Sequence, residues 1–119
     1  DREASGYAQS VFDTAEPNAV IFSNSDEQTF SFWYLQNVQG LRPDLRVVDT
    51  RLFTWPWYRA RLPRQYPDLH LPADAELRPL RELDALVAAN PGRVVYFTTP
   101  GAQAATEQVG KLWRMRPGG

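Results

Sequence analysis

Residues 19–26 read AVIFSNSD, four apolar residues followed directly by four polar ones. A short apolar run rich in β-branched residues is typical of a strand that is buried on both faces, as in a parallel sheet. The polar residues are suited to leaving the sheet and starting a helix, and Ser25 with Gln28 three residues later matches a capping box. This stretch therefore predicts a strand-to-helix unit of an α/β fold.

The same alternation continues on both sides of this unit. Apolar residues at helical spacing predict helices over 2–15, from Ser25 to about Gln39, over 56–62 with Thr54 as cap, over 80–90 and over 101–109. Further strands are expected over 45–49, 94–97 and 111–116, the last as a half-buried edge strand, and 63–78 is expected to be an irregular loop. All 119 residues then form a single domain, a three-layer α/β/α sandwich with a small, mostly parallel, Rossmann-like sheet.

Composition excludes several classes of function. There is no cysteine and only one histidine, His70, so disulfides, thiol catalysis and multi-histidine zinc sites are excluded. Thirteen basic and 14 acidic residues give a net charge of −1, which argues against a nucleic-acid surface. The longest wholly apolar run has four residues, so we expect no membrane-spanning helix within the chain, and no signal peptide is recognisable.

The ends of the predicted strands offer a candidate ligand crevice, because ligands of such sheets sit beyond the carboxyl ends of the strands. Asn24 and Asp26 follow the first strand, Asp49 ends the second and Thr98 follows the third. Asp26 could serve as a cation ligand or a general base, but an acid in the first turn of a helix is also explained by capping. No glycine-rich phosphate loop or Gly-x-Ser-x-Gly elbow is present, and we expect no cofactor and no metal site.

Aromatic residues cluster in two places, residues 30–34 and 53–58. Within the first cluster, Phe30, Trp33 and Tyr34 fit a core-facing helical stripe, and Phe32 points away from it. We therefore expect Trp33→Ala to lower the free energy of unfolding by about 3–5 kcal/mol. The alternatives to core packing are a stacking surface for a sugar and an interfacial belt against a membrane domain.

One ordered series of motifs carries a family resemblance over about residues 1–62. The series comprises Asn18-Ala19, Asp26, Thr29-Phe30, Trp33-Tyr34-Leu35-Gln36, Gly40-Leu41-Arg42-Pro43-Asp44, Val47-Val48 and Trp57-Tyr58. It resembles the soluble C-terminal domain of a family of multi-spanning bacterial membrane proteins, long described as a domain of unknown function. That family is related to the protein O-mannosyltransferases and other GT-C glycosyltransferases.

The chain departs from the family pattern in the loop after the first strand. The family has Gly-Asp-Asn-Asp-Thr-Phe, whereas this chain has Ser25-Asp26-Glu27-Gln28-Thr29-Phe30, so Gln28 replaces the second acid and weakens a metal interpretation. The residues that the motifs and strand ends mark as candidate contacts for a ligand or acceptor are Asn24, Asp26, Gln28, Trp33, Tyr34, Gln36, Arg42, Asp44, Asp49, Trp57 and Tyr58.

The resemblance implies a function for a larger protein more than for this piece. GT-C enzymes use polyprenyl-phosphate sugars, and their catalytic acid lies in the membrane domain. The chain would then be a non-catalytic, membrane-proximal accessory domain on the extracytoplasmic face of the bacterial cytoplasmic membrane. Its partners would be its own transmembrane domain and an acceptor protein or glycan. The alternative is an α/β ligand-binding or enzymatic domain with its site at the strand ends.

Overall fold

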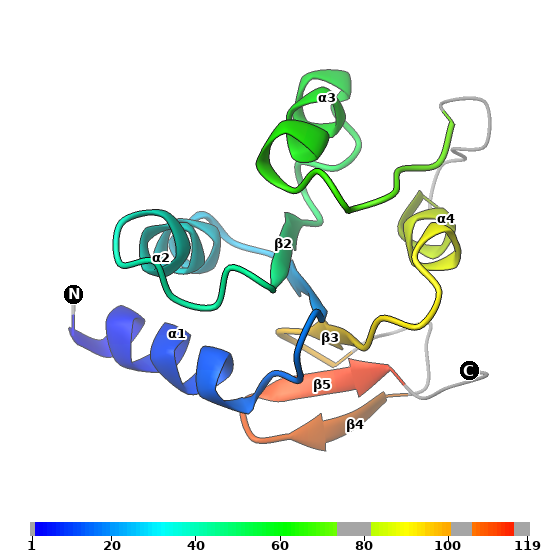
Figure 1. Cartoon of the computed structure of the whole chain (residues 1–119). Helices are drawn as coiled ribbons and strands as arrows, with labels where there is room; N and C mark the ends of the chain where they lie inside the picture. Colours follow the sequence, from blue (N-terminus) through cyan, green and yellow to red (C-terminus); the bar gives the residue numbers. More distant parts are fainter. Residues whose placement is uncertain (1, 74–81, 101–105, 116–119) are drawn as a thin grey trace.

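The computed structural model of the chain describes residues 2–73, 82–100 and 106–115. Along the chain these residues form α1 (Arg2–Thr14), β1 (Val20–Ser23), α2 (Asp26–Asn37), β2 (Arg46–Asp49), α3 (Pro56–Gln65), α4 (Glu82–Ala89), β3 (Val95–Phe97), β4 (Thr106–Val109) and β5 (Leu112–Met115). The strands form one sheet in the order β2-β1-β3-β5-β4 (Figure 1). The predicted α/β class is confirmed.

The sheet is mixed, and the predicted mostly parallel sheet is wrong in this respect. β1 pairs in parallel with β2 and β3, but β5 pairs antiparallel with both β3 and β4. The helix expected over 101–109 is also wrong for residues 106–109, which form β4, while 101–105 lie outside the described residues. Gly110, with φ +61°, permits the tight turn that folds β4 back onto β5, and this pairing overrides the weak helical pattern.

The strand at 112–115 is confirmed, but its expected place at the edge of the sheet is wrong. β5 lies between β3 and β4, so β4 takes one edge and β2 takes the other. Sequence alternation shows that a strand is half-buried, but it does not say which strands will pair with it. The finer Rossmann-like description of the fold stays a prediction.

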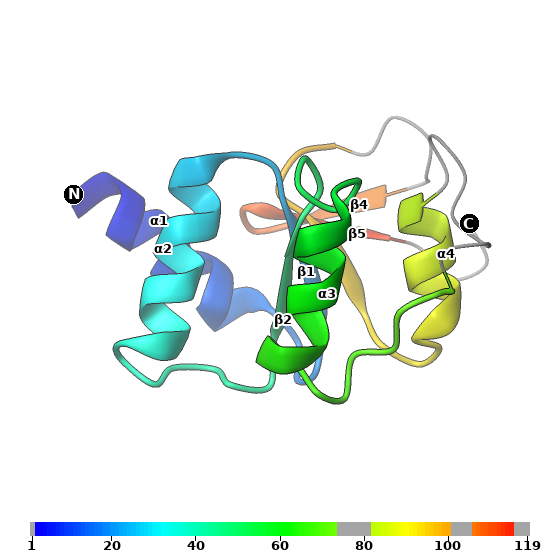
Figure 2. The same cartoon turned by 90° about the horizontal axis from the view of Figure 1, so that it is seen from above.

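Apolar side chains form two cores, one on each face of the sheet. Ile21, Val47 and Tyr96 join the apolar residues of α1 and α2 on one face. Val20, Phe22 and Val48 join those of α3 and α4 on the other. Successive strand residues alternate between the two faces because the side-chain period of a strand is two. Figure 2 shows α1 and α2 grouped on one side of the strands and α3 and α4 on the other.

The buried face of α2 is not the one that we predicted. Phe32 is fully buried and stacks on Phe12 of α1, with ring centroids 5.6 Å apart. Phe30, Trp33 and Tyr34 are instead 66%, 39% and 41% exposed. The apolar spacing identified an aromatic stripe correctly. It could not show that α1 and the sheet lie on the side of Phe32 and Leu35, so placing Trp33 in the core was wrong.

The expected helix signals are met in part. Ser25 accepts a hydrogen bond from the backbone N–H of Gln28, as in a capping box. Past the end of α2, Gly40 has φ +67° and the N–H of Leu41 bonds to the carbonyl of Leu35 at 2.9 Å.

The limits of α3 differ from those that the sequence predicts. The N-cap of α3 is Trp55, and no side chain caps this end, so Thr54 does not have the predicted role. α3 also continues through Pro63 to Gln65, so the irregular segment begins later than predicted, and residues 74–78 of it lie outside the described residues.

None of the helices in the described part of the chain combines the length and the apolar character that crossing a membrane requires.

Candidate functional site

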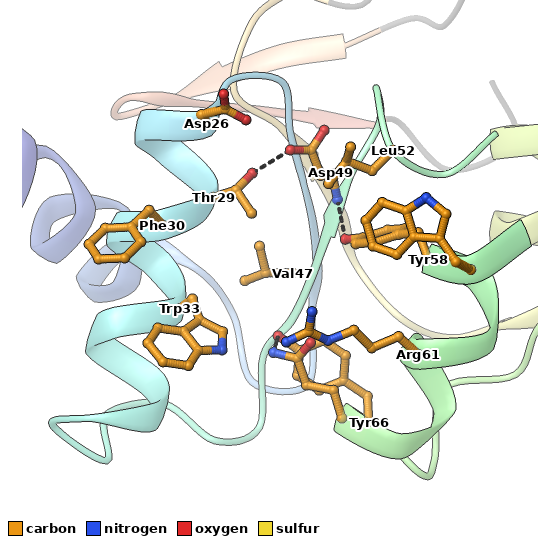
Figure 3. A pocket seen from close by; sticks show the side chains of 12 residues that line it. Asp26, Thr29, Phe30, Trp33, Val47, Asp49, Leu52, Tyr58, Arg61 and Tyr66 are labelled. Atoms are coloured by element: carbon orange, nitrogen blue, oxygen red, sulfur yellow. Dashed lines mark hydrogen bonds between the residues drawn. The ribbon is translucent and has the colours of Figure 1, made fainter. Parts of the chain in front are cut away.

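A pocket of about 440 Å³ opens between α2 and α3, beside the edge strand β2 (Figure 3). Its volume lies within the range of about 300–1,000 Å³ that is usual for ligand sites. The lining residues come from these three elements, from the turn after β2 and from the residue that caps the end of α3: Asp26, Thr29, Phe30, Trp33, Val47, Asp49, Leu52, Trp57, Tyr58, Arg61, Gln65 and Tyr66.

Aromatic rings stand on both walls of the pocket. Phe30 and Trp33 lie on the α2 side, with ring centroids 6.2 Å apart and planes 28° apart. Trp57 lies on the α3 side, is 55% exposed and meets Tyr58 edge to face at 5.8 Å. Large apolar side chains that are exposed together around a cavity are typical of a binding surface.

Two tyrosines of the α3 segment cover the outer edge of β2. The Tyr58 hydroxyl accepts a hydrogen bond from the backbone N–H of Asp49 at 2.8 Å, and Tyr66 is hydrogen-bonded to the backbone of Val47. The Tyr66 hydroxyl also donates to Gln36 Oε1 at 2.7 Å. Burial raises the pKa of Tyr58 and of Tyr66 to about 12, so both phenols are neutral at physiological pH. The edge of β2 is therefore closed to a further strand at these positions.

The carboxylate of Asp49 is fully buried at the inner end of the pocket. It accepts hydrogen bonds from Thr29 Oγ1 at 2.7 Å, from the backbone N–H of Arg51 at 2.9 Å and from the Arg51 guanidinium at 2.8 Å. Burial opposes its charge, but the hydrogen bonds from Arg51 and Thr29 outweigh burial and lower the pKa of Asp49. Asp49 stays ionised and its oxygens are occupied, so it is suited to holding the site together and poorly suited to proton transfer.

Asp26 extends this network to the surface. The Arg51 guanidinium reaches from Asp49 to Asp26 Oδ1, which it meets at 2.7 Å, while the Asp26 side chain is 93% exposed. A chain of charges therefore runs from the buried end of the pocket to its mouth. Because Asp26 begins α2, its predicted place in the first turn of a helix is confirmed.

Asn24 and Gln28 form a separate polar cluster where β1 and β3 end. Gln28 Oε1 accepts from the backbone N–H of Asn24 at 3.0 Å and from Thr98 Oγ1 at 2.9 Å. Asn24 Nδ2 donates to Thr99 Oγ1 at 3.2 Å. The strand ends therefore do not gather Asn24 and Thr98 into the same pocket as Asp26 and Asp49, since neither Asn24 nor Thr98 lines it.

Arg42 and Asp44 lie away from the pocket and join the α2–β2 connection to the end of α1. Two nitrogens of Arg42 meet the two oxygens of Asp44 at 3.0 Å each, and Arg42 also donates to the carbonyl of Phe12. Asp44 accepts from the backbone N–H of Asn18 at 2.9 Å. The bond from Arg42 holds the pKa of Asp44 at about 2. These contacts give both residues a structural role.

Gln36 and Tyr34 also lie outside the lining. Gln36 Nε2 donates to the carbonyl of Leu45 at 2.8 Å, and its oxygen accepts from Tyr66, so its amide joins α2 to β2 and α3. Tyr34 is 41% exposed on the outer surface of α2.

Sequence comparison assigns the chain to a family. The family described as TMEM260-associated domain 2 matches residues 4–79, more than half of the chain. The chain belongs to this family. It is also 32% identical over 68 residues to the mouse (Mus musculus) protein O-mannosyl-transferase TMEM260, a match that covers 57% of this chain and 10% of that protein. The chain thus spans about a tenth of the length of this relative. No solved structure matches it significantly.

For this member of the TMEM260-associated domain 2 family, the structure brings together five of the predicted contact residues. These are Asp26, Trp33, Asp49, Trp57 and Tyr58. Sequence reasoning missed most of the other lining residues and assigned Phe30 to the core. A signal for them exists in the helical spacing: Asp26, Thr29 and Trp33 follow one another along α2, and Trp57, Arg61 and Gln65 recur every four residues along α3.

The described residues contain no group of three or more histidine, cysteine, aspartate or glutamate side chains that could hold a metal ion. His70, the single histidine of the chain, is exposed.

Proposed function

We propose that this chain is an extracytoplasmic accessory domain of a membrane-embedded glycosyltransferase of the GT-C, O-mannosyltransferase-like type, and that it is not itself catalytic. The observation that carries the proposal is the family match over residues 4–79, together with the 32% identity to a protein whose name states O-mannosyl transfer. The match covers about a tenth of that relative. Under this proposal the catalytic residues belong to the remaining part of the larger protein.

The side chains support a non-catalytic role. Two carboxylates line the pocket among the described residues, and of these Asp49 is fully buried. It is ionised, and its oxygens already accept hydrogen bonds from Thr29 and Arg51. A general acid or base needs a proton or a free lone pair within reach of the substrate. Asp49 offers neither, and Asp26 is solvated at the mouth of the pocket.

The exposed aromatic residues support packing against a larger body. Phe30, Trp33 and Tyr34 lie on α2, and α2 packs beside α1, the first element of the chain (Figure 1). In the proposed arrangement this side faces the chain's own transmembrane domain, and the domain helps to bind acceptor protein or glycan. Amphipathic aromatic rings are well suited to a membrane-proximal surface.

The test uses the full-length gene. Residues 1–119 would be deleted, and transfer of sugar from a polyprenyl-phosphate sugar would be measured in membranes, with insertion of the shortened protein checked separately. Loss of transfer by a correctly inserted protein supports the proposal, and unchanged transfer contradicts it. Transfer catalysed by the 119-residue chain alone would contradict the non-catalytic assignment.

A ligand-binding or enzymatic α/β domain is the second candidate, favoured by the pocket itself. Asp26 and Asp49 come from the carboxyl ends of β1 and β2, and both line the cavity, as a strand-end site requires. The two candidates are compatible if an accessory domain binds part of the acceptor. If the second candidate is an enzymatic domain, the isolated chain turns over a substrate, whereas an accessory domain does not.

A further inference from the structure

The pocket between α2 and α3 combines exposed aromatic walls with polar groups of both signs. We propose that it is a binding site for a neutral sugar ring, that is, for one pyranose residue of a glycan. This inference goes beyond the accessory role proposed above and does not depend on it, because it rests on the geometry and charge of the pocket alone.

The aromatic walls supply the first half of the recognition. Trp33 and Trp57 stand on opposite walls and are 39% and 55% exposed, and Phe30 lies beside Trp33. In Figure 3, Phe30 and Trp33 project from α2 on one side of the cavity, and Arg61 faces them from α3. One face of a pyranose ring carries mainly C–H groups, which pack against the electron-rich face of an aromatic ring.

Polar groups at the mouth supply the second half. Asp26 uses one carboxylate oxygen for Arg51, and the other points to solvent on a side chain that is 93% exposed. The Gln65 amide donates to the Tyr66 hydroxyl at 3.3 Å, which leaves its oxygen as an acceptor. The salt bridges among the described residues do not include Arg61. Donors and acceptors placed around an apolar ring surface are what a polyol requires.

The charge of the pocket favours a neutral ligand. Asp26 and Asp49 bring two negative charges to the lining and Arg61 brings one positive charge. Arg51, which does not line the pocket, pairs with both carboxylates and balances the second negative charge. An anion such as phosphate would meet the carboxylate of Asp26, and a cation would meet the guanidinium group of Arg61.

The experiment follows the indole N–H signals of the 119-residue chain by NMR during titration with methyl glycosides of mannose, glucose, galactose and N-acetylglucosamine. We expect at least one glycoside to shift the signals of Trp33 and Trp57 in a saturable way, with a dissociation constant on the order of millimolar. Trp113 is an internal control because it lies on β5, three strands away from β2, and its signal should not move.

Two matched variants decide whether the pocket itself is responsible. Trp57→Ala should weaken binding on the order of tenfold, as removal of an aromatic contact in a binding site commonly does. Trp55→Ala is the control, since Trp55 is 54% exposed, lies two residues away and does not line the pocket. Both side chains are largely exposed, so both variants should keep the fold, which circular dichroism would verify.

Three results would overturn the proposal. The first is the absence of a saturable shift of Trp33 and Trp57 with any of the four glycosides at tens of millimolar. The second is equal weakening by Trp55→Ala and Trp57→Ala. The third is a saturable response of the same signals to inorganic phosphate or to a proline-rich peptide but not to glycosides, which would reassign the pocket to an anion or a peptide. None of these results bears on the deletion experiment in membranes.

Discussion

The hydroxyl of Tyr58 lies 2.8 Å from the backbone nitrogen of Asp49 and accepts its hydrogen bond. This contact joins α3 to the outer edge of β2, where no neighbouring strand could satisfy that N–H group. The same contact holds one wall of the pocket in place, because both residues line the cavity. A buried tyrosine thus completes the sheet edge and positions α3 at the same time.

Alkaline pH should destabilise the chain through Tyr58 and Tyr66. Burial raises the pKa of each to about 12, above the ordinary value of 10.0. The unfolded state therefore loses protons first, and the stability that neutral phenols provide is complete below pH 10 and is lost as pH rises towards about 12. Urea denaturation at increasing pH would measure this loss.

Tyr58→Phe separates the two effects of this residue. The substitution should lower the free energy of unfolding by about 1–3 kcal/mol at neutral pH, because the buried N–H of Asp49 loses its acceptor. It should also make the free energy of unfolding fall less steeply as the pH rises above 10, because one ionisable phenol has been removed. Tyr34→Phe is the control, because Tyr34 is 41% exposed. An alkaline profile that is the same in the native chain and in Tyr58→Phe would contradict this role.

Adjacent aromatic residues of α2 should differ sharply in their contribution to stability. Phe32→Ala should lower the free energy of unfolding by about 3–5 kcal/mol, because it removes a fully buried ring that stacks on Phe12. Trp33→Ala should cost less than about 1 kcal/mol, since surface substitutions have small effects. Chemical denaturation of both variants gives the comparison, and a larger loss for Trp33→Ala would show that the helix is rotated.

Asp49→Asn should destabilise the chain by about 1–3 kcal/mol, because a buried carboxylate with charged and neutral donors is replaced by an amide that cannot accept all of them. Asp26→Asn changes the same charge on a side chain that is 93% exposed and should have little effect. Thermal unfolding of the two variants tests the contrast. Equal stability of both would mean that Asp49 is not the centre of the network.

Acid should weaken the link between α1 and the α2–β2 connection. The pKa of Asp44 is lowered from 3.8 to about 2 by Arg42, so its contribution is present above pH 3.8 and is lost as pH falls towards about 2. Asp44→Asn should therefore reduce stability at neutral pH and flatten this part of the acid profile. The free energy of unfolding would be measured at stepwise lower pH for the native chain and for Asp44→Asn. Identical dependence on pH in the two proteins would show that the Arg42–Asp44 pair has no role.

The candidate site was predictable where local patterns carry it. Asp26 and Asp49 were found because strand ends in α/β folds converge, and the structure places both in the pocket. Phe30 and Trp33 were recognised as a stripe but were placed in the core. Helical periodicity gives the angle between residues around the axis, but it does not say which side of the helix meets the rest of the protein.

The sequence by itself determined the α/β class, most of the helix and strand positions before residue 100, and the family. Each depends on neighbouring residues: apolar runs for β1 and β2, and Ser25 for the start of α2. Only the tertiary structure decided that residues 106–109 pair with β5, that Phe32 instead of Trp33 is buried, and that α3 closes the edge of β2 to form a pocket. These features arise from contacts between segments far apart in the chain, whose energies no local pattern contains.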